Sequence, residues 1–219
     1  MKISRHPPFG SIKVRTPPAW AGQCIGVMGG SFNPPHEGHA VAARAALRRL
    51  RLDRLWWVVT PGNPLKAHGD LPSQADRMAA CRVLATDPRM IVTGFEAELG
   101  TPYTAATLAF LKRRHPGVRL VWVMGADNLA GFHRWQRWRE IVRSVPICVV
   151  DRPGWRLPAL ASPAARAMCR WRIPEARGSR LAHLRPPAWV FLTTRLNPSS
   201  STQLRLVAAM RPRPDGHGR

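Results

Sequence analysis

Two histidines stand three residues apart directly after a glycine-rich turn. The segment from Gly30 to His39 has the sequence GSFNPPHEGH, follows a short apolar run and precedes an Ala- and Leu-rich stretch. This order predicts a strand, a turn and a helix, the arrangement in which backbone N–H groups and a helix N-terminus bind a phosphate. His36 and His39 would lie on one face of the first helical turn, toward whatever the loop holds. The segment therefore predicts a phosphate site that contains two histidines.

The loop differs from the common phosphate and metal motifs. It is neither a Gly-x-x-x-x-Gly-Lys-Ser/Thr loop nor a Gly-x-Gly-x-x-Gly dinucleotide loop. The zinc-protease motif needs two histidines four residues apart, whereas here the spacing is three, with Gly38 between them. The four cysteines are scattered without a Cys-x-x-Cys pair, so neither a zinc site nor a disulfide framework is predicted. The sequence predicts no metal ligands.

Composition limits the class of protein. A chain of 219 residues is long enough for one domain with a sizeable core. It contains no apolar run of about 18 residues, so no membrane span is predicted. The first 23 residues carry basic residues and prolines without an apolar stretch, unlike a secretory signal. The cytoplasm is the expected location.

The net charge of +22 favours a polyanionic partner. Nucleic acid, an anionic membrane and phosphorylated small molecules all meet that description. A general arginine bias is the alternative, since the basic residues are spread along the chain and arginine far outnumbers lysine. No nucleic-acid recognition motif accompanies the charge, so dedicated nucleic-acid binding is not favoured.

Apolar runs rich in β-forming residues alternate with helical patterns from residue 24 onward. The expected strands are Cys24–Met28, Leu55–Thr60, Met90–Thr93, Leu120–Met124, Pro146–Val150 and Trp189–Leu192. The expected helices are His39–Arg51, Ser73–Ala85, Thr104–His115, Trp135–Val142 and Pro163–Arg172. Such alternation predicts βαβ units, and ligands bind at the carboxyl ends of their strands.

The predicted fold class is α/β: a Rossmann-like, doubly wound, mostly parallel sheet flanked by helices, in a single domain. The domain is expected over residues 24–207. Residues 1–23 form a basic, proline-containing extension that we expect to be flexible, and residues 208–219 a disordered tail. The stretch from Asp151 to Pro187 is basic and proline-rich, and the sequence assigns it no role.

A second anion-binding pattern stands near the C-terminus. Residues 200–205 have the sequence SSTQLR at the expected start of a helix. Together, GGSFNPPHEGH and SSTQLR resemble the two signatures of the nucleotidylyltransferase superfamily, His-x-Gly-His and Ser-Ser-Thr-x-x-Arg. The resemblance covers residues 24–207 and extends to bacterial nicotinate-nucleotide adenylyltransferases through PGNPLK (61–66), YTAATL (103–108), and WVMGADNL (122–129) with Phe132, His133, Trp135 and Trp138. Two positions depart from that pattern: Ala106, where the family usually has an acidic residue, and Ser199, where it usually has an aliphatic one.

The resemblance implies a reaction between ATP and nicotinate mononucleotide that yields nicotinate adenine dinucleotide and pyrophosphate. His36 and His39 would bind the ATP phosphates, with Arg205 as the third catalytic residue. Phosphates nearby should raise the pKa of the histidines. The other implied ATP contacts are Gly29, Gly30, Ser31, Phe32, Ser201 and Thr202. Mg²⁺ is expected to enter with ATP, held by phosphates and water.

Five residues are implied on the side of the acceptor. Lys66 would contact a phosphate or carboxylate, and Trp135 would offer a flat face to the pyridine ring, while Trp138 packs inward. Asp127 would accept hydrogen bonds from ribose or adenine. Tyr103 and Thr104 would donate to the nicotinate side.

Other functions stay open at this point. The same chemistry could use nicotinamide mononucleotide, phosphopantetheine or a cytidylyl-transfer substrate. A different class of protein, a basic nucleic-acid-binding protein without turnover, would retain the fold. The sequence does not indicate an oligomeric state.

Overall fold

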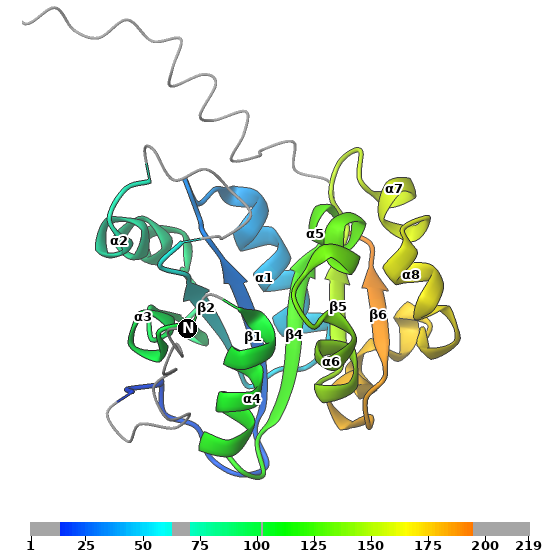
Figure 1. The fold of residues 1–219 in the computed structure, drawn as a ribbon, viewed down its shortest axis with the longest axis horizontal. Coiled ribbons are helices and arrows are strands. Elements are labelled where there is room, and N and C mark those ends of the chain that lie inside the picture. The colour runs from blue at the N-terminus through cyan, green and yellow to red at the C-terminus, as the bar shows by residue number, and fades with distance from the viewer. Residues whose placement is uncertain (1–13, 63–70, 102, 195–219) are drawn as a thin grey trace, which may run out of the picture.

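The computed structural model describes residues 14–62, 71–101 and 103–194, which build one sheet of six strands (Figure 1). All neighbouring strands are parallel, in the order β3-β2-β1-β4-β5-β6. The strands are β1 (Cys24–Gly30), β2 (Arg54–Val59), β3 (Met90–Thr93), β4 (Arg119–Gly125), β5 (Ile147–Val150) and β6 (Trp189–Leu192). The predicted class, a doubly wound α/β domain, is confirmed.

Side chains of the strands alternate between two core layers. In β1, Ile25 and Val27 belong to one layer, and Cys24 and Met28 to the other. The strands are apolar on both faces because helices cover both sides of the sheet. One layer is closed by α1 (Glu37–Arg49), α2 (Gln74–Leu84) and η3 (Glu175–His183). The other is closed by α4 (Thr104–Arg114), α5 (Ala126–Gly131), α6 (Trp138–Ser144), α7 (Arg156–Leu160) and α8 (Pro163–Ala167).

The order of the strands reverses beside β1. From β1 the chain winds outward to β2 and β3, then returns to place β4 on the other side of β1. In a doubly wound sheet this reversal opens a crevice outside the carboxyl ends of the two central strands. Those ends are Gly30 in β1 and Gly125 in β4. The glycine loop predicted to bind phosphate begins at this crevice.

All six expected strands are present, and four of the five expected helices match within a few residues. The helix expected over Pro163–Arg172 is instead two short pieces, α8 and η2 (Cys169–Trp171). Five further helical pieces were not predicted: α3 (Glu96–Leu99), α5, η1 (Phe132–Arg134), α7 and η3. The first four have six residues or fewer, too few for an apolar period to show, whereas η3 is a nine-residue 3-10 helix in the basic, proline-rich stretch after β5.

Part of residues 14–23, within the extension expected to be flexible, contacts the domain. Val14 is buried in the core layer that contains β1 and α4. The backbone N–H of Arg15 donates to Glu98, and the Thr16 hydroxyl lies 2.9 Å from Nε2 of His115. Residues 1–13 and the predicted tail lie outside the described residues.

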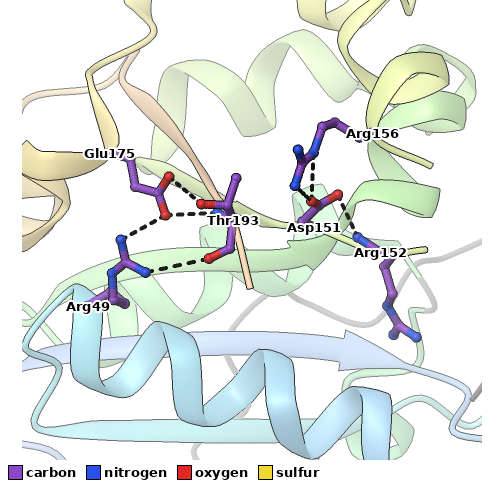
Figure 2. A network of polar contacts seen from close by, with 6 residues as sticks. All are labelled: Arg49, Asp151, Arg152, Arg156, Glu175 and Thr193. Atoms are coloured by element: carbon purple, nitrogen blue, oxygen red, sulfur yellow. Dashed lines mark hydrogen bonds and ion pairs between the residues drawn. The ribbon is translucent and has the colours of Figure 1, made fainter. Parts of the chain in front are cut away.

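Two carboxylates fix the end of the sheet around β5 and β6 (Figure 2). Glu175 accepts hydrogen bonds from the N–H and hydroxyl of Thr193 and from Arg49 of α1. Asp151, which follows β5, accepts from the side chain of Arg156 and from the backbone N–H of Arg152. The basic stretch after β5 is thus held to the sheet by acidic groups. None of the helices described is long and apolar enough to cross a membrane.

Candidate active site

The glycine loop leaves β1 in a conformation that its neighbours enforce. Phe32 has a φ of 45°, in the left-handed region that costs energy for a residue with a side chain. Its buried ring stacks on Trp57 with centroids 5.4 Å apart. A Cβ on Gly29 would lie 2.6 Å from the indole of Trp122. Gly29 is therefore required by packing beneath the loop, a reason that the sequence does not reveal.

His36 and His39 lie together at the start of α1. His36 is the residue that caps the helix, and its backbone N–H donates to Nδ1 of His39 over 3.2 Å. The two ring centroids are 3.9 Å apart. Phe32 meets the His39 ring edge to face at 5.0 Å, which anchors that imidazole to the loop. The predicted pairing of the two histidines on one face of the first turn is confirmed.

Gly38, between the histidines, leaves room for Arg152, which comes from the loop after β5. A Cβ there would lie 2.9 Å from Nδ1 of His36 and 3.0 Å from Nη1 of Arg152. Arg152 follows β5, so the loops after β1 and β5 meet at this point. The glycine in the His-x-Gly-His pattern therefore lets the imidazole and the guanidinium approach the helix N-terminus.

Arg152 also reaches the end of β4. Its Nε lies 3.6 Å from Oδ1 of Asp127, in the first turn of α5. A Cβ on Gly125 would overlap that Asp127 oxygen and lie 3.0 Å from Nε of Arg152. Gly125, which ends β4, and Gly38, in the first turn of α1, thus lie on either side of the Arg152 guanidinium. The sequence analysis missed Arg152, although its place just after a parallel strand is the signal that could have found it.

Three polar atoms in this cluster are buried without a hydrogen bond to any described residue: Nδ1 of His36, Oδ1 of Asp127 and Nε of Arg152. Burial, together with the charge of Arg152, lowers the pKa of His36 to about 4. In the ligand-free protein at neutral pH, His36 is therefore neutral and Arg152 carries the positive charge. Buried polar atoms without partners are rare in folded proteins and fit a site completed by a polar ligand.

The residues implied on the acceptor side lie around α4 and α5. Tyr103 caps α4 and is partly exposed, and Thr104 is the first residue of that helix. Trp135 is partly buried and meets Trp122 and Phe132 edge to face. Trp138 is buried, as the sequence indicated. Nothing in the described contacts brings Tyr103, Thr104 or Trp135 against the two histidines.

Four implied site residues lie outside the described residues: Lys66, Ser201, Thr202 and Arg205. Among the described residues, no three His, Cys, Asp or Glu side chains gather in a group that could hold a metal ion. Asp127 is the carboxylate present in the cluster around Arg152.

Comparison with known proteins decides the family. A cytidylyltransferase-like family model matches residues 27–207. A Bradyrhizobium protein called probable nicotinate-nucleotide adenylyltransferase is 55% identical over 181 residues, 83% of this chain and 94% of the relative. An Agrobacterium fabrum protein of the same name is also 55% identical, over 83% of this chain and 97% of its own. The chain belongs to the nicotinate-nucleotide adenylyltransferase family.

A solved structure agrees with the fold assigned to this nicotinate-nucleotide adenylyltransferase family member. The Plasmodium falciparum nicotinic acid mononucleotide adenylyltransferase complexed with NaAD has a TM-score of 0.63 to this chain. The match covers 84% of this chain and 83% of the Plasmodium chain at 16% sequence identity. At that identity the likeness establishes the fold, while membership of the family rests on the sequence relatives. The chain is a nucleotidyltransferase.

Proposed function

We propose that this chain joins ATP and nicotinate mononucleotide into nicotinate adenine dinucleotide and releases pyrophosphate. The observation that carries the proposal is the cluster of His36, Asp127 and Arg152 at the switch point of the sheet, with buried polar atoms that make no hydrogen bond to a described residue. Family membership identifies the ligands that such a cluster would serve.

The chemistry needs charge stabilisation and alignment. An oxygen of the mononucleotide phosphate attacks the α-phosphorus of ATP, and the bond from that phosphorus to the pyrophosphate oxygen breaks. The attacking phosphate is already anionic at neutral pH, so no general base is needed. Fixed N–H donors and cations lower the barrier by holding two anions in line and stabilising charge at the reacting phosphorus.

Each group in the cluster has a distinct part in this proposal. The N–H groups of Gly30, Ser31 and Phe32 bind phosphate oxygens, and His36 and His39 donate to the oxygens around the α-phosphorus. Arg152 supplies the fixed positive charge beside His36, which is neutral before ATP binds. Bound phosphates raise the pKa of His36 and so favour its cationic form.

The remaining assignments come from the family resemblance. Ser201, Thr202 and Arg205 hold the phosphates that leave, and Lys66, Tyr103, Thr104 and Trp135 receive the acceptor. Asp127, beside Arg152, accepts from the nucleoside. ATP enters as its Mg²⁺ complex, in which the ion neutralises part of the phosphate charge and keeps most of its ligands from phosphate and water.

Parallel assays of pyrophosphate release test the proposed substrate pair. The full chain is supplied with ATP and Mg²⁺, then with nicotinate mononucleotide, nicotinamide mononucleotide or phosphopantetheine. We expect the highest kcat/KM with nicotinate mononucleotide. Equal or higher kcat/KM with another acceptor would move the function to that acceptor, and no release with any of them would contradict the proposal. A His39→Ala variant that keeps near-normal turnover would contradict the assignment of the histidines to phosphate binding.

A further inference from the structure

Arg77 is a buried arginine that the mechanism above does not use. It lies in the first turn of α2 with 3% of its surface exposed. Its Nε donates to the carbonyl oxygen of Pro72 over 3.0 Å. Its Nη1 donates to those of Ser31 at 2.6 Å and Thr60 at 2.8 Å, and its Nη2 to that of Pro61 at 3.2 Å. No ion pair joins it to an acidic group in the described part of the chain.

These four bonds tie together two loops at the carboxyl edge of the sheet. Ser31 belongs to the glycine loop after β1, whereas Thr60 and Pro61 begin the loop after β2. A direct bond reinforces the link, because the N–H of Thr60 donates to the carbonyl oxygen of Gly30 over 3.0 Å. Burial lowers the pKa of Arg77, yet an arginine remains charged in proteins.

Only an arginine can make this set of contacts. Its planar fork carries five N–H donors in fixed directions, and four of them are used here. A lysine has the same charge but three donors on one rotating nitrogen. Burying a cation without a counter-ion lowers the stability of the folded state. The position of Arg77 therefore favours a role other than stabilising the fold.

The bonds also determine where the neighbouring N–H groups point. In a trans peptide the C=O and the following N–H point in opposite directions. The bonds that follow Ser31 and Pro61 are not among the cis peptides of the described residues. Holding the carbonyl oxygens of Ser31 and Pro61 therefore turns the N–H groups of Phe32 and Gly62 away from Arg77. Neither N–H makes a hydrogen bond to another described residue.

We infer that Arg77 is a positioning residue that orients the N–H groups of Phe32 and Gly62 to bind substrate phosphate. The inference rests on the proposed function, since it assigns these donors to the substrates of that reaction. Arg77 acts from behind the loops, through the opposite ends of the same peptide units. Its contribution depends on the shape of the guanidinium as well as on the charge.

Variants at position 77 separate shape from charge. Arg77→Lys keeps the charge and Arg77→Met removes it, while Arg82→Met makes the same change at an exposed position of α2. We expect both variants at position 77 to raise KM for ATP at least tenfold, and Arg82→Met to match the parent chain. Normal KM in Arg77→Lys would overturn the inference, because charge alone would then suffice.

If those variants do not fold, a measurement on the unmodified chain tests the same inference. The amide ¹H–¹⁵N signals of Phe32 and Gly62 are followed by NMR while ATP is added. We expect both signals to shift with the occupancy of ATP. Shifts in the His36 and His39 signals without shifts in these two amides would overturn the inference. Turnover of the parent chain with nicotinate mononucleotide, measured first, tests the proposed function separately.

Discussion

Two inward-facing arginines flank the crevice, and they differ in how completely the protein satisfies them. Arg77, on the β2 side, directs four N–H donors at backbone carbonyl oxygens. Arg152, on the β4 side, has an Nε that makes no hydrogen bond within the described part of the chain and lies 3.6 Å from Asp127. The first arrangement is complete within the described residues, whereas the second leaves polar atoms that the proposed function pairs with the substrate. Under the proposed function, this difference separates a residue that shapes the site from one that meets the substrate.

Replacing Arg152 should give the largest effect on catalysis. Arg152→Met removes the cation beside His36, so we expect kcat/KM to fall by a factor on the order of 100–1,000, the usual cost of losing one charge-stabilising donor. The melting temperature should change little, because within the described residues the side chain of Arg152 has one ion-pair contact, 3.6 Å from Asp127. Steady-state kinetics and thermal unfolding measure the two quantities, with Arg166→Met as an exposed control. A large loss of stability with normal kinetics would make Arg152 a structural residue and remove it from the proposed mechanism.

Gly38→Ala tests the same cluster by displacement. The added methyl would push His36 or Arg152 out of place, since both lie about 3 Å from it. We expect kcat/KM to fall by a factor of about 10 or more, by analogy with the cost of misplacing catalytic groups. Helix propensity acts in the opposite direction, because alanine is favoured over glycine by up to about 1 kcal/mol. An active variant with unchanged kinetics would show that the cluster tolerates rearrangement.

Glu96 makes the stability of the β2 side depend on pH. This buried carboxylate accepts from Thr107 at 2.6 Å, and burial raises its pKa to about 7 despite hydrogen bonds from Thr107 and Thr60. Between about pH 5 and pH 7 the folded state holds a proton that the unfolded state has lost. The free energy of unfolding should therefore fall as pH rises, by up to about 1.4 kcal/mol per pH unit from this group. Denaturant unfolding of the parent chain and of Glu96→Gln, whose curve should lack this slope, measures it.

His36 should make ligand binding on the β4 side depend on pH, with the smallest effect of the four. Its lowered pKa of about 4 leaves it neutral in the free protein at pH 5.5. Bound phosphates raise that pKa, so ATP binding should take up a fraction of a proton at this pH and almost none at pH 8. Calorimetry in two buffers of different ionisation enthalpy measures the uptake. His36→Asn, which cannot titrate, is the control; equal uptake in both proteins would exclude His36 as its source.

The sequence predicts the elements of this fold better than the contacts between them. Continuous apolar runs located every strand, and the pairing of His36 with His39 followed from helical spacing. The place of Arg152 just after a predicted strand indicates only the edge of the sheet, because its partners depend on β5 lying beside β4. Arg77 resembles any charged residue on a surface helix until its carbonyl partners are known. The contacts of both arginines depend on long-range packing, which a local sequence pattern does not encode.

The space left by Gly38 has a consequence for how such sequences can vary. The imidazole of His36 and the guanidinium of Arg152 lie about 3 Å from the position that a methyl group on residue 38 would take. The amino acids tolerated at positions 38 and 152 are therefore interdependent, although the two are far apart in the chain. A substitution at position 38 alters which substitutions position 152 accepts. The His-x-Gly-His motif and the residue at position 152 should therefore vary together among related sequences.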